Sequence, residues 1–286
     1  MLSSGRRCFL FSRLLSSRQL VYDEHGDPSK VVHLESVQLA SRVAPGHVRV
    51  KWMAAPINPA DINQIQGVYP VKPLLPAIGG NEGVGEVDEI GEGVSNLSVG
   101  DRVIPAKSGI GTWRQHGDHG ENEVWPIDKR LSIEASSSLQ VNPSTAYRML
   151  NDFVSLQPGD TVIQNGGNSA VGRAVMQICA IRGLECVSVV RNRDGIDQLK
   201  EELISLGSSQ VITEEEMAST MRGKIKANLG LNCVGGRSSL FMASMLKKKG
   251  VMVTYGGMSK QPLMASQSYI LLSSSLFDPY CFSHIY

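Results

Sequence analysis

The sequence predicts an α/β protein of two domains, an antiparallel and barrel-like β domain followed by a doubly wound parallel sheet. A chain of 286 residues is long for a single hydrophobic core. Its first half is rich in glycine and proline and contains only short strand patterns, whereas strands alternate with helices from about residue 158 onward. That alternation is typical of a parallel sheet that is covered by helices on both faces.

Residues 1–19 have the composition of a mitochondrial transit peptide. Four arginines are interleaved with serines and with leucines and phenylalanines, and no acidic residue precedes Asp23. A disordered N-terminus is the alternative. The rest of the chain has 24 of the 28 Lys and Arg and all 27 Asp and Glu. This slightly acidic balance gives no reason to propose nucleic-acid binding. No apolar run reaches the ~18 residues that a membrane span needs.

The first domain is expected over residues 20–141. Residues 48–52 alternate between apolar and polar side chains, as a half-buried strand does, and 83–87 and 100–104 are short strand candidates next to glycines. None of the five cysteines forms a C-x-x-C pair, and none lies between Cys8 and Cys179. This spacing argues against a disulfide framework and against a cysteine-rich zinc site.

The second domain is expected over residues 142–266, and it begins with a helix in which Pro143 occupies the first turn. The strand candidates are 161–163, 186–190, 210–212, 230–234 and 251–255, and the helix candidates are 170–181, 196–206 and 238–246. A doubly wound dinucleotide domain usually has six strands, and only five are convincing here. We therefore expect a sheet that is incomplete at its C-terminal end, followed by an atypical tail over 267–286.

A phosphate-binding loop is predicted between the first strand and the first long helix of this domain. Gly166 and Gly167 follow the strand, and Gly172 lies in the helix that comes next. Small residues let the backbone approach a pyrophosphate, whose charge the helix N-terminus favours. The strict G-x-G-x-x-G pattern is absent, so the interpretation depends on the strand, helix and strand around the loop. A glycine-rich turn without a ligand is the alternative.

Two arginines after the second strand indicate which dinucleotide binds. NAD sites place an acidic residue there for the ribose 2′-hydroxyl. This chain has Arg191 and Arg193 instead, and no acid occurs from Cys186 to Arg193. Guanidinium groups bind a 2′-phosphate through charge-assisted hydrogen bonds, so the pattern favours NADPH. Two solvated surface arginines are the alternative.

Several ordered blocks resemble the mitochondrial trans-2-enoyl-CoA reductases, in the zinc-free, quinone oxidoreductase-like branch of the medium-chain dehydrogenase/reductase superfamily. The blocks are PINPADIN at 56–63, GGNEG at 79–83, GTWR at 111–114, VNPSTAY at 141–147, LNCVGG at 231–236 and TYGGM at 254–258. The resemblance covers about residues 20–265. It implies a GroES-like β-barrel catalytic domain and a Rossmann domain, without a catalytic zinc.

The zinc-free character agrees with one substitution. Zinc alcohol dehydrogenases carry a metal-binding histidine in a Gly-His-Glu triplet, and this chain has Asn81 before Glu82. Zinc requires three or four well-placed ligands, which this pattern does not supply. A second polar run contains His116, Asp118 and His119, for which a polar loop is a simpler interpretation than a metal site.

The resemblance also implies the residues of the site. Tyr69 would be the proton donor, and a phenol is protonated at neutral pH; a tyrosine that only packs against substrate is the alternative. Asn142 would lie near the nicotinamide, and the remaining residues would bind the phosphates, the 2′-phosphate and the length of the cofactor. These are Asn168, Ser169, Ala170, Val171, Arg191, Asn192, Arg193, Tyr255, Gly256, Gly257 and Met258.

The function implied is NADPH-dependent reduction of trans-2-enoyl thioesters, carried by CoA or acyl carrier protein, in mitochondrial fatty-acid synthesis. The expected location is the matrix, and a homodimer is expected if the C-terminal part of the family is present. Two alternatives stay open. One is a quinone or alkenal reductase of the same branch, and the other is an inactive variant that is C-terminally truncated or alternatively spliced.

Overall fold

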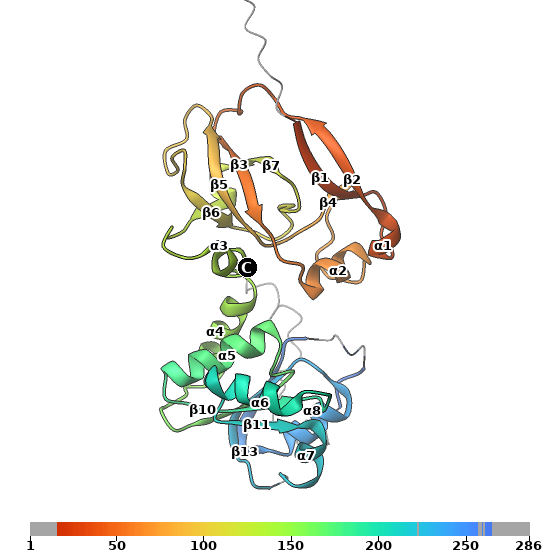
Figure 1. The fold of residues 1–286 in the computed structure, drawn as a ribbon, viewed down its shortest axis with the longest axis vertical. Helices are drawn as coiled ribbons and strands as arrows, with labels where there is room; N and C mark the ends of the chain where they lie inside the picture. The colour runs from red at the N-terminus through yellow and green to blue at the C-terminus, as the bar shows by residue number, and fades with distance from the viewer. Residues whose placement is uncertain (1–15, 222, 257–258, 260, 265–286) are drawn as a thin grey trace, which may run out of the picture. The chain divides into compact units, whose positions relative to one another are not determined.

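The computed structural model describes residues 16–221, 223–256, 259 and 261–264. The chain divides into two compact units, with the boundary between Gln140 and Val141 (Figure 1). Among the described residues, no helix has both the length and the apolar character that a bilayer span requires. The expected tail over 267–286 lies outside the described residues, so the expectation that the sheet lacks a sixth strand is not tested.

The first unit consists of two antiparallel sheets, in agreement with the predicted β domain. A three-stranded sheet has the order β2-β1-β4 and a five-stranded sheet the order β7-β3-β5-β6-β8. The strands are β1 (Ser16–Tyr22), β2 (Val32–Gln38), β3 (His47–Ala54), β4 (Ala77–Ile78), β5 (Val84–Ile90), β6 (Arg102–Pro105), β7 (His116–Gly120) and β8 (Val124–Pro126). The helices are α1 (Pro28–Val31), α2 (Pro59–Ile65), the 3-10 turn η1 (Glu121–Glu123) and α3 (Ile133–Ser137).

Strand β1 begins earlier than the expected start of the domain at residue 20. Ser17 is fully buried, and its Oγ donates to the carbonyl oxygen of His116 at 3.1 Å and accepts from the His116 N–H at 2.9 Å. Residues 16–19 also pair with β2. The structure therefore places in a strand four residues whose Arg and Ser content was typical of a transit peptide. Residues 1–15 lie outside the described part.

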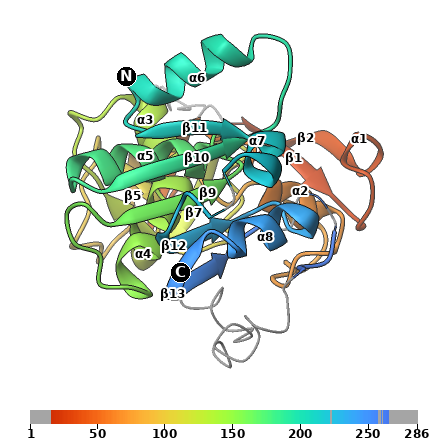
Figure 2. The same cartoon turned by 90° about the horizontal axis from the view of Figure 1, so that it is seen from below.

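The second unit is built on five parallel strands, which confirms the predicted sheet. Figure 2 shows them in the order β11-β10-β9-β12-β13. They are β9 (Thr161–Asn165), β10 (Glu185–Val190), β11 (Gln210–Thr213), β12 (Ala227–Asn232) and β13 (Leu246–Thr254). The helices are α4 (Asn142–Asp152), α5 (Ala170–Ile181), α6 (Ile196–Ser205), α7 (Glu214–Ser219) and α8 (Gly236–Ala243).

Helices cover both faces of this sheet, because successive strand residues point to opposite sides. Val162 packs in one core with apolar residues of α4, α5 and α6. Its neighbour Ile163 packs in a second core with Met217 of α7 and Met242 of α8. A doubly wound arrangement follows, in which the strands are buried between two helical layers.

Several predicted boundaries of this unit differ from the observed ones. The helix expected over 238–246 ends at Ala243, and β13 already begins at Leu246 because this residue pairs with Ala227. Helix α7 was not predicted. Its first turn is capped by Thr213 Oγ1, which accepts from the Glu216 N–H at 3.2 Å, while the Glu216 carboxylate accepts from the Thr213 N–H at 2.7 Å. This reciprocal capping stabilises a helix too short to show apolar periodicity.

Candidate active site

The candidate cofactor site lies at the carboxyl ends of the parallel strands. The crossovers diverge between β9 and β12, the position at which doubly wound sheets bind ligands. Asn165 at the end of β9 donates to Asn232 Oδ1 at 2.7 Å and to Ser238 Oγ at 3.0 Å, and its Oδ1 accepts from the Cys233 N–H at 2.7 Å. These buried hydrogen bonds hold the two diverging segments at a defined separation.

The loop after β9 has a close-packed backbone that only glycine allows at two positions. Gly166 has a φ of +60°, a left-handed conformation that favours glycine. A Cβ on Gly172 would lie 2.6 Å from the carbonyl oxygen of Gly167. Helix α5 therefore begins directly against the loop, as the predicted phosphate site requires.

The first turn of α5 presents backbone donors to a phosphate. Ser169 is its N-cap, and the Ser169 Oγ accepts from the Gly172 N–H at 3.1 Å. The N–H groups of Ala170 and Val171 have no intrahelical acceptor, because first-turn positions lack one. The Asn168 carbonyl accepts from Arg173 Nε at 3.3 Å, which holds the loop on its other side. Residues 168–171 therefore form a site that fits a pyrophosphate.

The segment 191–193 follows directly on Val190, the last residue of β10, and all three side chains are exposed. Neither Arg191 nor Arg193 forms an ion pair with a carboxylate of the described residues. Two guanidinium groups at the end of the second strand, without a bound carboxylate, fit a 2′-phosphate.

One carboxylate near these arginines was missed by sequence reasoning. Glu214 begins α7 at the carboxyl end of β11, and its Oε1 accepts from Ser238 Oγ at 2.9 Å. Burial raises the pKa of Glu214, and the positive charge of Arg191 opposes this rise. The signal in the sequence was an acidic residue directly after a strand.

The remaining predicted cofactor residues lie at two other positions of this unit. Tyr255 follows β13, and its N–H donates to the Asn232 carbonyl at 3.0 Å. Burial raises the pKa of Tyr255 well above its ordinary value, so this phenol stays protonated. A Cβ on Gly256 would lie 2.9 Å from Cys233 Cβ, so the segment runs close beside the end of β12. Asn142 is the first residue of α4. Gly257 and Met258 lie outside the described residues.

Tyr69, the predicted proton donor, belongs to the first unit, in the loop that follows α2. The side chain is half-buried. The N–H groups of Val68 and Tyr69 donate to the carbonyl oxygen of Asn63 at 3.0 and 3.2 Å. The loop therefore turns back over the last turns of α2, which fixes the backbone at Tyr69 relative to that helix.

A buried polar network holds α2 in place, and Asn81 lies at its centre. Its Nδ2 donates to Asp61 Oδ1 at 2.7 Å and to Gln64 Oε1 at 2.9 Å, and its Oδ1 accepts from Ser108 Oγ at 2.8 Å and the Gly109 N–H at 2.7 Å. Where zinc alcohol dehydrogenases have a metal-binding histidine, this chain thus has an amide with a complete set of hydrogen bonds.

Two further hydrogen bonds join the PINPADIN and GGNEG segments. Asn58, the N-cap of α2, donates through Nδ2 to Glu82 Oε2 at 2.8 Å, and its N–H donates to Asp61 Oδ2 at 2.7 Å. Burial raises the pKa of Asp61, and the hydrogen bonds from Asn58 and Asn81 oppose that rise. Segments that were recognised separately in the sequence are therefore one structural unit.

The run from His116 to Glu123 does not converge on a common point. Asp118 binds Arg49 through two hydrogen bonds of 2.7 and 2.8 Å, while His119 is buried on the other face of β7 with its Nε2 3.0 Å from Arg114 Nη2. Burial and the charge of Arg114 lower the pKa of His119 to about 3. These contacts account for the polar run without a metal.

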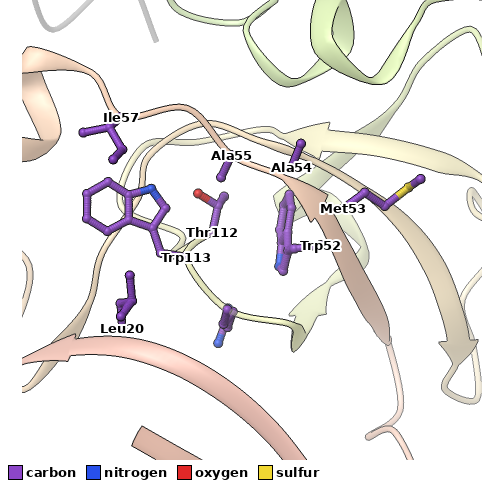
Figure 3. Close-up of a pocket in the computed structure, with 9 residues that line it drawn as sticks. Leu20, Trp52, Met53, Ala54, Ala55, Ile57, Thr112 and Trp113 are labelled. Carbon is purple, nitrogen blue, oxygen red and sulfur yellow. The ribbon is translucent and has the colours of Figure 1, made fainter. Parts of the chain in front are cut away.

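A pocket of about 320 Å³ opens in the first unit, and Figure 3 shows Trp113 and Trp52 on either side of Thr112. Trp113 Nε1 donates to the Pro56 carbonyl at 3.2 Å. A Cβ on Gly79 would lie 2.4 Å from the Trp113 ring, so the tryptophan packs directly on this glycine. Contact between the PINPADIN, GGNEG and GTWR segments again brings three separate motifs together.

Comparison with known proteins identifies relatives that span most of the chain. Residues 44–128 match the family model of the alcohol dehydrogenase GroES-like domain. The chain is 57% identical over 251 residues to the mitochondrial enoyl-[acyl-carrier-protein] reductase of Caenorhabditis elegans, covering 88% of this chain and 73% of that protein. The human enzyme of the same name is 51% identical over 259 residues, covering 89% of this chain and 69% of its own.

Solved structures agree with these relatives. The Etr1p complex with NADP and crotonyl-CoA has a TM-score of 0.85 and 37% identity, covering 89% of this chain and 79% of Etr1p. The Etr1p/Etr2p heterodimer from Candida tropicalis, a mitochondrial 2-enoyl thioester reductase, has the same TM-score and identity, covering 90% and 80%. An Escherichia coli quinone oxidoreductase complexed with NADPH has a TM-score of 0.76 at 23% identity, covering 89% and 77%, which shows the fold alone.

Proposed function

This chain belongs to the family of mitochondrial enoyl-[acyl-carrier-protein] reductases, and from that membership we propose that it reduces trans-2-enoyl thioesters with NADPH in mitochondrial fatty-acid synthesis. Relatives at 57% and 51% identity carry that name, and a structural neighbour holds both NADP and an enoyl-CoA. The observation in this structure that carries the proposal is the set of backbone donors at the start of α5, together with Arg191 and Arg193 after β10, which form no ion pair with a carboxylate of the described residues.

The reaction adds a hydride to the β carbon of the enoyl thioester and a proton to the α carbon. NADPH, when bound, supplies the hydride. Ala170 and Val171 would bind its pyrophosphate, and Arg191 and Arg193 would bind its 2′-phosphate. Negative charge develops on the thioester oxygen as the hydride is added, and it disappears when the α carbon is protonated.

We assign that protonation to Tyr69. Its phenol O–H would donate to the α carbon, the new C–H bond would form as the O–H bond breaks, and water would return a proton to the phenolate. The support is the position of Tyr69 in a loop that α2 and the buried network hold. Asn142, Asn192 and the segment from Tyr255 to Met258 are proposed to line the cofactor.

Partners and assembly are proposals of the same kind. The substrate class is an enoyl group on CoA or on acyl carrier protein, as the neighbour's crotonyl-CoA and the relatives' names suggest. A homodimer is proposed if the C-terminal part of the family is present, and a two-chain assembly is known for the related Etr1p, which forms a heterodimer with Etr2p. A quinone reductase activity has weaker support, because the quinone oxidoreductase from Escherichia coli shares 23% identity with this chain.

The test is oxidation of NADPH by the purified protein with trans-2-hexenoyl-CoA, compared with a quinone. We expect turnover of the thioester, and a preference for the quinone would contradict the proposal. Tyr69→Phe should lower kcat by about 10²-fold or more, in the range that one acid catalyst supplies. A wild-type rate in Tyr69→Phe would remove the proton-donor role.

The cofactor assignment has its own experiment. Arg191→Ala combined with Arg193→Ala should weaken binding of NADPH and leave binding of NADH unchanged, because only NADPH carries the 2′-phosphate. Arg130→Ala is the matched control, since this arginine is exposed in the first unit and paired with Asp128. Equal losses for NADPH and NADH would refute the 2′-phosphate role.

A further inference from the structure

Gln64 of α2 joins the buried network of the first unit to the loop that carries Tyr69. The Gln64 side chain is only 4% exposed. Its Oε1 accepts from Asn81 Nδ2 at 2.9 Å, and its Nε2 donates to the carbonyl oxygen of Val71 at 3.2 Å. One buried amide therefore touches both the centre of the network and a residue two positions after Tyr69.

The hydrogen bonds along this path have only one consistent direction. The Gly109 N–H can only donate, so Asn81 presents Oδ1 to it and turns Nδ2 toward Asp61 and Gln64. Gln64 must then accept through Oε1, which turns its Nε2 toward the Val71 carbonyl, a group that can only accept. Because backbone groups define both ends, the orientation of each side-chain amide is determined.

The apolar side chains of this loop pack little on its outer side. The side chains of Val68, Val71 and Leu74 are 71%, 48% and 93% exposed, so they contribute little packing. Hydrogen bonds to Asn63 hold the loop at residues 68 and 69, and Gln64 holds it at Val71. Tyr69 lies between these two attachments.

We propose that Asn81 and Gln64 are positioning residues for Tyr69, and that their amide relay holds the loop at 67–71 so that the phenol reaches the α carbon. The inference rests on the proposed role of Tyr69 as proton donor. Asn81 stands where zinc alcohol dehydrogenases have a metal-binding histidine, and here it would help to hold the loop of the proton donor. Neither residue would touch the substrate, and both would act through the backbone at Val71.

The kinetic test is a double-mutant cycle between Gln64→Met and Tyr69→Phe. Methionine has a similar length and removes both hydrogen bonds of the relay. In the wild-type background, Gln64→Met should lower kcat for trans-2-hexenoyl-CoA by roughly 10-fold to 10²-fold, the scale expected for a misplaced group. Its KM for NADPH should stay within about two-fold, since all of the proposed cofactor residues lie in the second unit.

In the Tyr69→Phe background, the same substitution should change kcat by less than about two-fold, because no phenol is left to position. An equal fold-loss in both backgrounds would overturn the proposal. Gln64→Glu is the second variant if Gln64→Met does not fold. It keeps the acceptor for Asn81 and the side-chain volume, and its carboxylate replaces the donor to Val71 with a charged acceptor, so the same cycle applies.

A measurement that does not depend on activity separates this inference from the proposed function. Amide hydrogen exchange at Val68 and Tyr69 should become faster in Gln64→Met. Ser17→Ala is the matched control: it removes two buried hydrogen bonds in the same unit and should leave exchange at these amides unchanged. Unchanged exchange in Gln64→Met overturns the relay even if the protein is active. An inactive wild type overturns the proposed function, while faster exchange in the variant would still support the relay.

Discussion

Substitution of Gly172 by alanine should weaken both the stability of the second unit and its affinity for NADPH. The added Cβ would lie 2.6 Å from the Gly167 carbonyl oxygen and 2.9 Å from that of Gly166. Both obstacles are backbone atoms, so no side chain can turn away. A normal contact between a carbon and an oxygen is longer by several tenths of an ångström, and the start of α5 must move away from the loop by about that amount.

The cost follows from that displacement. Overpacking of a closely packed interior costs about 1–3 kcal/mol. For a domain of this size class, such a loss lowers Tm by roughly 2–4 °C per kcal/mol. Movement of α5 also displaces the N–H groups of Ala170 and Val171, which are proposed to bind the pyrophosphate. We therefore expect Kd for NADPH to rise by about 10-fold, equivalent to about 1.4 kcal/mol.

The assays are thermal unfolding, followed by circular dichroism, and fluorescence titration with NADPH. Gly120→Ala is the matched control, because Gly120 has a φ of −58° and its added Cβ would lie no closer than 3.5 Å to the flexible Glu123 side chain. That variant should keep the wild-type Tm to within about 2 °C and bind NADPH normally. If Gly172→Ala matched the control in both assays, the close approach of α5 to the loop would not matter for binding.

Three further predictions concern the first unit. Burial of His119 lowers its pKa to about 3 from 6.5, so the unfolded chain binds an extra proton between these values and stability falls as pH falls through this window; chemical denaturation should show a loss of about 2 kcal/mol from pH 7 to pH 5, and His119→Gln should show a smaller loss. Asp61→Asn should lower the free energy of unfolding in urea by about 1–3 kcal/mol, because the new NH₂ group would face a donor of Asn58 or Asn81. Wild-type stability of this variant would contradict the proposed hydrogen-bond network. Mass spectrometry of the mature protein should find an N-terminus at or before Ser16, since later cleavage would remove part of β1; a start after Ser16 would contradict this.

The second unit was largely predictable because its signals are local. Apolar periodicity gave helix α5 its predicted bounds of 170–181, and each of the five predicted strands overlaps an observed one. Boundaries failed where pairing between distant segments decides them, as at Leu246, which pairs with Ala227. Local sequence carries no record of such a partner, so a helical pattern was extended into a strand.

Prediction was weaker in the first unit for the same reason. Residues 16–19 look like part of an import signal, and only their pairing with β2 and the burial of Ser17 identify them as a strand. Tyr69 was found by resemblance and not by any feature of its own. Gln64 was not found, because its proposed role depends on hydrogen bonds to Asn81 and Val71 that no spacing along the chain indicates.

By itself, the sequence determined the classes of fold and cofactor, because strand and helix periodicity, glycine at close approaches and the charge of Arg191 and Arg193 are properties of neighbouring residues. Only the tertiary structure decided how the loop that carries Tyr69, the proposed proton donor, is held. Asp61, Gln64 and Asn81 are ordinary polar residues in the sequence, and they become a directed network when folding buries them together. Burial makes each of these hydrogen bonds necessary, because an unpaired buried polar group would cost stability. The positions of these three residues in the fold, and not their identities alone, therefore define the network.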